Sequence, residues 1–271
     1  MVAERRTDRI SRVASAEESL VAGAGQRTKI TPDMAEPQTN TPASETPAHL
    51  ARAVLRRADR AALATSQHGW PFASLVLAAL GQDGTPLLLI SDLSEHAKNI
   101  KGDPRISLLF DGTQGLDDPL TGPRVTVLGE AHVTWDEGLR RRFLARHPSA
   151  DLYAGFKDFQ LHRVTVARAH LVAGFGRIHW IEARDFLAAP DPSFGAEESA
   201  ALADLNSDAD MVNIAVHTLG LDGTGWRFTG IDPEGLDLRR AGSIARATFT
   251  APAPTPAAAR QALARGEFFR P

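Results

Sequence analysis

The chain has 271 residues, 43 % of them hydrophobic, which is enough to bury a core in one large domain or two small ones. Its net charge of −3 gives no general electrostatic reason to bind nucleic acid or an anionic membrane, and the lack of cysteine excludes disulfides, thiolate metal sites and a cysteine nucleophile. No run approaches the roughly 18–20 apolar residues of a membrane helix, and the first residues lack the apolar segment of a secretory signal. We therefore expect a cytoplasmic protein.

Residues 1–46 carry little periodic apolar pattern. The stretch TKITPDMAEPQTNTPASETP within them is rich in proline, threonine, alanine and glutamate. Such a segment cannot bury enough apolar surface to offset the entropy of ordering it. The sequence therefore predicts a disordered N-terminal arm over residues 1–46.

At Thr46 the pattern changes to that of a helix. Thr46 is a residue type that caps helices, and Pro47 suits the first helical position. The spacing of three apolar residues on one face predicts a helix over residues 47–58. These residues are Leu50, Val54 and Leu55.

From Ala61 onward the sequence alternates between short apolar runs and turns. AALATS, FASLVLAALG, PLLLIS, RISLLF and RVTVLGEAHVTW read as strands, QDGT as a hairpin turn, and residues 136–146 as a helix. FQLHRVTVARAHLVAGFGRIHWI is typical of two further strands, with a turn expected near Ala167 and Arg168. Six or seven short strands with helices at the margins indicate an antiparallel barrel over residues 47–187.

Residues 188–195, AAPDPSFG, are typical of a linker, and the pattern after them differs. Apolar spacing predicts a helix over 197–219, and GWRFTGIDPEGLDLRR with SIARATFT reads as a hairpin. A closing helix is expected over 256–268. We thus predict a small α+β domain over residues 196–271, so that the fold class is mainly β with an α+β appendage.

A short polar helix stands between two strands, Leu87–Ile90 and Ile106–Phe110. It begins at Ser94, and the free amides of a helix N-terminus favour phosphate or carboxylate. His96 and Asn99 are three residues apart and so share one face of this helix. Further along, the Gly-Phe-Gly of residues 174–176 stands in a strand pattern without a third glycine. It is therefore no dinucleotide fingerprint, and it indicates a bulge or the close approach of a ligand.

Several stretches together resemble a known family. GWPFASLVLAALGQDGTPLLLISDLSEHAKNIKGDPRISLLF resembles the core of the FMN-binding split-barrel superfamily, to which pyridoxamine 5'-phosphate oxidases belong. DPLTGPRVTVLGEAHV, RRFLARHPSADLYAGFKDFQLHRV and AHLVAGFGRIHWI resemble its HugZ-like haem-utilisation branch, and IDPEGLDLR resembles the small domain that follows the barrel there. The resemblance covers residues 47–270. It implies a split β-barrel homodimer with its ligand sites at the dimer interface.

In the flavin oxidases of this superfamily, four basic residues hold the FMN phosphate. The matching positions here are Ser74, Ala79, Glu95 and His96. Because a phosphate dianion depends on charge-assisted hydrogen bonds, these replacements predict a sharply weakened phosphate site. The resemblance leaves a set of hydroxyl, imidazole and amide donors for FMN or for a haem propionate. These are Ser74, Ser91, Ser94, His96 and Asn99.

The haem branch needs an axial iron ligand and donors for the propionates. His179 follows the Gly-Phe-Gly-Arg stretch that supports the haem edge in that branch, so the resemblance makes it the candidate axial ligand. Arg177 is the candidate distal or propionate contact. Since the two residues are two positions apart, they would face the same side of a strand.

The sequence also departs from the branch. Its C-terminal domain usually carries His-Met-Asn-x-Asp-His, where this chain has Asp204 and Ala209 at the histidine positions and keeps Asn206 and Asp208. Three readings stay open: a haem-binding or haem-degrading HugZ-like protein, which we rank first; a flavin-dependent oxidoreductase; and a non-catalytic binding protein on the same scaffold. Whether the chain is an enzyme is left undecided, and an active form would be an oxidoreductase.

Overall fold

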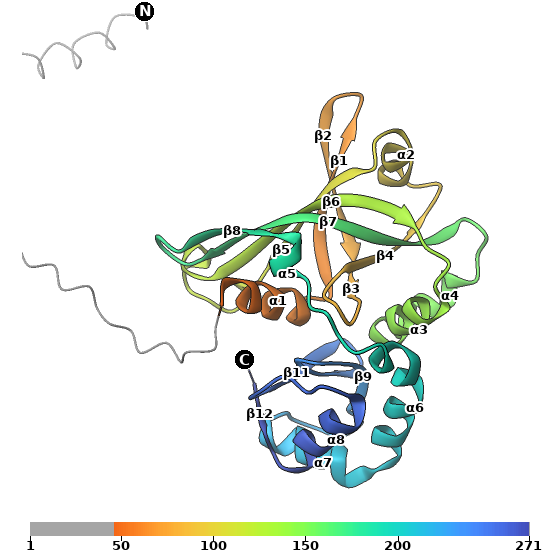
Figure 1. Cartoon of the computed structure of the whole chain (residues 1–271). Helices are drawn as coiled ribbons and strands as arrows, with labels where there is room; N and C mark the ends of the chain where they lie inside the picture. The colour runs from red at the N-terminus through yellow and green to blue at the C-terminus, as the bar shows by residue number, and fades with distance from the viewer. Residues whose placement is uncertain (1–45, 271) are drawn as a thin grey trace, which may run out of the picture. The chain divides into compact units, whose positions relative to one another are not determined.

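The structure is a computed structural model that describes residues 46–270 (Figure 1). The predicted arm over residues 1–46 lies outside the described residues, apart from Thr46. The described residues belong to one compact unit with two antiparallel sheets. The larger sheet comprises β1 (Arg60–Gln67), β2 (Trp70–Leu77), β3 (Ala79–Leu80), β4 (Pro86–Ser91), β5 (Arg105–Asp111), β6 (Pro123–Val133), β7 (Phe159–Ala173) and β8 (Ile178–Glu182). The smaller sheet comprises β9 (Arg227–Asp232), β10 (Gly235–Arg240), β11 (Ser243–Phe249) and β12 (Phe268–Phe269).

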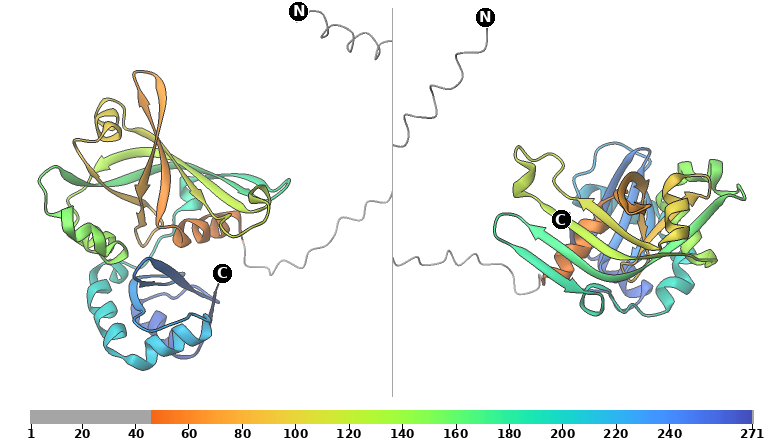
Figure 2. Two further views of the ribbon diagram at one scale, coloured as in Figure 1. Left: turned by 180° about the vertical axis from the view of Figure 1, so that it is seen from behind. Right: turned by 90° about the horizontal axis from the view of Figure 1, so that it is seen from above.

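Helices lie at the margins of both sheets (Figures 1 and 2). They are α1 (Pro47–Arg57), α2 (Glu95–Gly102), α3 (Glu137–Arg146), α4 (Asp151–Ala154), α5 (Ala183–Phe186), α6 (Ser193–Ser207), α7 (Ala209–Thr218) and α8 (Pro256–Ala264), with short 3-10 turns η1 (Pro119–Thr121) and η2 (Pro148–Ala150). Among the described residues, no helix is long and apolar enough to cross a membrane.

The larger sheet runs in the order β2-β1-β5-β6-β7-β4-β3, with β8 added beside β7. Alternate residues of β5 face the interior, where Ile106, Leu108 and Phe110 are buried. This curled antiparallel sheet confirms the expected split barrel. The predicted first helix is also confirmed, because the Thr46 side chain accepts a hydrogen bond from the His49 amide at 3.2 Å, with Pro47 at the start of α1.

The turn expected near Ala167 and Arg168 is wrong. Strand β7 continues through both residues, and a register shift opposite Leu128 and Gly129 leaves Ala167 as the extra residue of a β-bulge. The chain reverses at the Gly-Phe-Gly stretch instead, where Gly174 and Gly176 have φ of 109° and 75°. These glycines therefore form the β7–β8 turn rather than a bulge, because only a left-handed backbone closes the hairpin there.

The C-terminal part differs from its prediction in three places. The predicted hairpin is a three-stranded meander, because residues 227–240 already form the paired strands β9 and β10 before β11. The expected helix over 197–219 is interrupted at Asp208, whose carboxylate accepts from the amides of Asp210 and Met211 and so starts α7. The closing helix ends at Ala264, and Gly266, with φ of 69°, leads into β12. Helices α6, α7 and α8 pack with the smaller sheet around a separate apolar core.

A buried ionic cluster joins this second core to the barrel. Asp232, at the end of β9, is fully buried and lies 2.8 Å from Arg246, 3.2 Å from Arg56 and 3.5 Å from Arg142. Arg56 and Arg142 belong to α1 and α3, which flank the barrel. Apolar packing is thus not the only link between the two sheets. The division into domains at residues 187 and 196 remains a prediction.

His147 is a buried histidine that directly follows α3. Its Nε2 lies 2.9 Å from the Ala78 carbonyl, and its ring packs against Phe143 with 4.8 Å between centroids. Burial lowers the pKa of His147 to about 4, so the imidazole is neutral in the folded protein at pH 7. In the unfolded chain this imidazole is protonated at pH values below about 6.5, whereas in the folded protein it stays neutral down to about pH 4. The folded state is therefore destabilised relative to the unfolded state as the pH falls below about 6.5.

We expect the free energy of unfolding to fall by up to about 3 kcal/mol between pH 7 and pH 4 through His147 alone. Gln at this position keeps an N–H donor for Ala78 and does not titrate. Urea unfolding of wild type and His147→Gln at both pH values measures the effect as the difference between their pH dependences. Equal pH dependences would show that His147 is not the responsible group.

Candidate functional site

Two predicted site residues hold the start of α2 in place. The Ser94 hydroxyl donates to the Ser91 carbonyl at 2.7 Å and accepts from the Ala97 amide at 3.3 Å, so Ser94 is the N-cap. The Ser91 hydroxyl donates to Asp158 at 2.5 Å and accepts from the Leu93 amide. Both hydroxyls are therefore engaged in local structure.

Three other predicted residues meet where α2 lies beside β1 and β2. His96 Nδ1 is 3.2 Å from the Ser74 hydroxyl, and the Asn99 amide donates to the Thr65 hydroxyl at 3.0 Å. Partial burial lowers the pKa of His96, so its imidazole is neutral at pH 7. This α2 group (Ser74, His96 and Asn99) offers hydrogen bonds but no positive charge.

The start of α2 carries a carboxylate instead of the basic pair of the flavin oxidases. Glu95 is exposed, pairs with Lys98 at 2.7 Å and accepts from Gln67 at 3.4 Å. The hydrogen bond from Lys98 lowers the pKa of Glu95, which keeps it ionised. The remaining matching position, Ala79, is buried in the core. A phosphate here would meet the Glu95 carboxylate, and the ammonium groups of Lys98 and Lys101 are already paired with Glu95 and Asp92, which disfavours a dianion.

The other predicted residues lie on the β7–β8 hairpin. His179 pairs with Leu171 and shares its face with Ile181, the side of the barrel core, where His179 is half-buried. Arg177 is exposed and precedes β8, which begins at Ile178, so the strand alternation that would align it with His179 does not apply. The hairpin and the α2 group lie at separate ends of the sheet within one chain (Figures 1 and 2).

The structure reveals a group that the sequence reasoning missed, which we call the hairpin stack. It consists of Arg168, His170 and Trp180 on the outward face. His170 pairs directly with Trp180, and their ring centroids are 4.5 Å apart. The Arg168 guanidinium lies 4.3 Å from the Trp180 ring centroid, a cation–π contact. Had the turn been placed at Gly-Phe-Gly, cross-strand pairing would have predicted this juxtaposition from the sequence.

The β7–β8 hairpin also exposes apolar side chains. Phe175, at the tip of the turn, is 95 % exposed, and Ile178 and Trp180 are 58 % and 55 % exposed. Isolated exposed apolar residues are ordinary, but three within six positions form a patch of the kind that binds a ligand or another chain. Within residues 46–270, neither the His170 nor the His179 imidazole has a hydrogen bond or ion pair. Each imidazole therefore keeps a ring nitrogen available as a metal ligand.

The residues of the altered C-terminal motif have structural roles. The Asn206 side chain accepts from the Phe228 amide at 2.8 Å and donates to the Phe228 carbonyl at 3.0 Å, which fastens α6 to β9. Asp204 and Asp208 both pair with Arg260 of α8, at 2.7 and 2.8 Å. Ala209 is the first residue of α7. The motif therefore connects helices and sheet in this chain.

Replacing Asn206 with alanine is expected to lower the free energy of unfolding by about 1–3 kcal/mol, because it leaves two partly buried backbone groups of Phe228 without partners. Asp204→Ala breaks only an exposed ion pair and should cost at most about 1 kcal/mol. Urea unfolding of both variants, followed by far-ultraviolet circular dichroism, compares them. A smaller loss for Asn206→Ala than for Asp204→Ala would contradict this assignment.

Several known proteins are similar to this chain. A solved structure of Atu2129, a protein of unknown function from Agrobacterium tumefaciens, is 30 % identical with a TM-score of 0.67, covering 80 % of this chain and 94 % of that one. A haem-binding protein from Mycobacterium smegmatis is 32 % identical with a TM-score of 0.51, covering 82 % and 98 %. The chloroplastic non-canonical haem oxygenase HOZ of Arabidopsis thaliana is 33 % identical over 111 residues, 39 % of this chain; the match spans only 33 % of HOZ.

The family assignment rests on the barrel itself. The curled antiparallel sheet, the α2 element between β4 and β5 and the β7–β8 hairpin all lie within one matched segment. Residues 42–188, more than half of the 271 residues, match the family described as CREG, beta-barrel. The chain therefore belongs to the CREG beta-barrel family.

Proposed function

We propose that this protein binds haem at the β7–β8 hairpin, with one of the two hairpin imidazoles as the iron ligand. The observation that carries the proposal is the hairpin stack, which puts an imidazole, a guanidinium and an aromatic ring on one exposed apolar surface. The similarity over most of its length to the mycobacterial haem-binding protein supports it.

The donor set of the hairpin fits the group. Haem needs a nitrogen ligand for iron, an apolar surface for the macrocycle and cations for its propionates. His170, or the sequence-predicted His179, would supply the nitrogen. Arg168 or Arg177 would pair with a propionate, and Trp180 would contact the ring edge. Bound haem would supply a redox-active iron, and oxidative degradation of haem depends on such an iron.

The α2 group has a different part in this proposal. Its neutral donors, Ser74, His96 and Asn99, suit a hydrogen-bonded carboxylate better than a phosphate dianion. In a homodimer, which we also propose, the α2 group of one chain and the hairpin of the other would contribute to one site. Light scattering coupled to size-exclusion chromatography, with and without hemin, tests the dimer. A cytoplasmic location stays part of the proposal.

Parallel titrations of the full chain with hemin and with FMN, followed by absorbance, test the function. We expect a saturable Soret band at one haem per chain and no tight FMN binding. Tight FMN binding without haem binding would overturn the proposal, because it would show that neutral donors replace the missing cations. Binding of neither would favour a non-catalytic scaffold. Decay of the Soret band with ascorbate and dioxygen, yielding an open-chain tetrapyrrole, would extend the proposal to haem degradation.

A further inference from the structure

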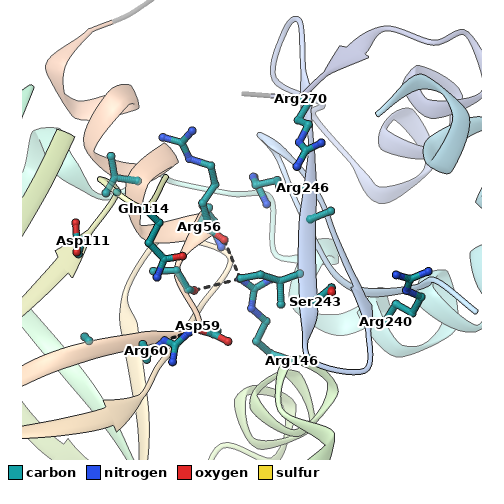
Figure 3. Close-up of a pocket in the computed structure, with 18 of the residues that line it drawn as sticks. Arg56, Asp59, Arg60, Asp111, Gln114, Arg146, Arg240, Ser243, Arg246 and Arg270 are labelled. Atoms are coloured by element: carbon teal, nitrogen blue, oxygen red, sulfur yellow. Dashed lines mark hydrogen bonds and ion pairs between the residues drawn. The ribbon is translucent and has the colours of Figure 1, made fainter. Parts of the chain in front are cut away.

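A large cleft opens between the barrel and the smaller sheet (Figure 3), and no residue of the hairpin stack lines it. Its volume is about 900 Å³, and its walls come from the end of α1, the start of β1, β11 and the end of the described chain. Arginines clearly outnumber aspartates among its lining residues, although the whole chain has a net charge of −3. Positive charge is thus concentrated in this cleft.

Buried arginines form the floor of the cleft. Arg246 is fully paired by Asp232 and Asp237, at 2.8 and 2.9 Å. Arg146 reaches from α3 to donate to the carbonyls of Arg56 and Ala58, at 3.0 and 3.1 Å (Figure 3). The floor is therefore rigid, with each guanidinium fixed by at least one partner.

Two donors on this floor have no acceptor. Arg56 Nε and Arg146 Nη1 are buried and make no hydrogen bond, and the nearest carboxylate oxygen to Arg146 Nη1 is that of Asp237 at 3.6 Å. The side chains of Arg56 and Arg146 are only 1 % and 6 % exposed. Both residues also line a second cavity of about 10 Å³, the size of one water molecule, and an ordered water can complete buried donors of this kind.

The rim of the cleft adds further cations. Within residues 46–270, Arg270 has no hydrogen bond or ion pair, and Figure 3 shows it on the same wall as Arg246. Arg240 donates to the backbone carbonyl of Asp222 and stacks on Trp226. Because neither partner group is an anion, these contacts do not balance the charge of Arg240. The Asp111 carboxylate is occupied by the amide and hydroxyl of Thr113. In the described part of the chain, the rim thus carries two arginines without a carboxylate partner, Arg240 and Arg270, and one unpaired carboxylate, that of Asp222.

We propose that this cleft binds a small phosphorylated organic molecule. Guanidinium groups recognise phosphate through paired, charge-assisted hydrogen bonds, and donors from α1, α3 and the C-terminal segment converge here. A volume of about 900 Å³ greatly exceeds that of a phosphate group and is in the range of organic-ligand sites. The phosphate lies against the arginines, and the organic body fills the remainder of the cleft.

Isothermal titration of the full chain at low salt, with inorganic pyrophosphate and with ADP as probes, tests this site. We expect one site per chain, with ADP binding at least tenfold more tightly than pyrophosphate because only ADP has an organic body. Arg270→Ala should weaken both probes about tenfold or more. Arg265→Ala is the matched control, because Arg265 is 65 % exposed, pairs with Glu267 and does not line the cleft.

A second variant does not depend on the C-terminal residue. Ser243 is exposed on the cleft wall, so Ser243→Asp adds a negative charge there and should weaken both probes, whereas Ser199→Asp on α6 should not. No binding of either probe, unchanged binding in Arg270→Ala and Ser243→Asp, or equal affinities for the two probes would overturn the proposal. Hemin binding should be unchanged in both variants, so that this test and that of the hairpin fail independently.

Discussion

Alanine at both hairpin histidines, His170 and His179, is expected to abolish the hemin Soret band or to weaken hemin binding by at least about 100-fold. One of these imidazoles would bind the haem iron, whereas the hairpin would otherwise offer only an apolar surface and one or two cations. Without either imidazole, hemin would be left with nonspecific apolar association. Absorbance titration of wild type and the double variant measures the difference.

The single variants identify the ligand. We expect His170→Ala to account for most of the loss, because His170 lies on the outward face, where a flat macrocycle has access, and its ring is held by Trp180. His179 faces the barrel core and is half-buried. If His179→Ala alone removes the Soret band, the assignment from family resemblance holds and the hairpin stack is only a contact surface.

A control separates ligand loss from misfolding. His132 is an exposed histidine of β6 that pairs with Glu130 at 3.2 Å, away from the hairpin turn. His132→Ala should bind hemin like wild type. If the double hairpin variant also binds like wild type, the haem site is not on this hairpin. Hemin binding by wild type would then have to be traced to another surface.

Asp232→Ala is expected to lower the free energy of unfolding by about 3–5 kcal/mol, the largest stability effect that we predict. The substitution leaves three buried arginines, Arg56, Arg142 and Arg246, without their shared carboxylate. Burial alone would raise the pKa of Asp232, but these arginines, Arg246 foremost, lower it below its usual range. The carboxylate is therefore ionised at pH 7, and its contribution is lost only as the pH falls below about 4.

Urea unfolding of wild type and Asp232→Ala at pH 7 measures this loss. Asp185→Ala is the matched control, because Asp185 is 62 % exposed and only 3.7 Å from Arg184, and it should stay within about 0.5 kcal/mol of wild type. A separate early transition of the smaller sheet in Asp232→Ala would show that the ionic cluster mainly joins the two cores. A loss no larger than that of the control would mean that nearby acids, such as Asp237 and Glu198, compensate.

Local residue chemistry was enough to predict much of the barrel. Thr46 and Ser94 cap the helices that their sequence positions indicate, and the alternating runs of β1 to β6 pair as an antiparallel sheet. These features depend on neighbours within a few residues, where side-chain periodicity and capping act. The replacement of basic residues by Glu95 and His96 could also be predicted from the sequence, because it needed only residue identity and the family resemblance.

Other features depended on partners far along the chain. The bulge at Ala167 exists because Gly129 on β6 allows a close approach; a Cβ there would lie 2.4 Å from the Thr165 carbonyl. The hairpin stack depends on the strand register, because the β7–β8 pairing places His170 opposite Trp180. A turn predicted at the wrong residues does not give this pairing. The Asp232 cluster and the arginine cleft join segments separated by some 90 to 200 residues, and no local pattern signals them.

The sequence, through its resemblance to a known superfamily, indicated the split barrel and the replacement of basic phosphate-binding residues, because motif residues can be compared without knowledge of the structure. Only the tertiary structure decided which side chains share a surface. Cross-strand register set the outward stack of Arg168, His170 and Trp180, and the packing of α1 and α3 against the smaller sheet gathered the buried arginines. Register and packing are long-range properties, and a one-residue shift in the register of the strands would place different side chains on each face.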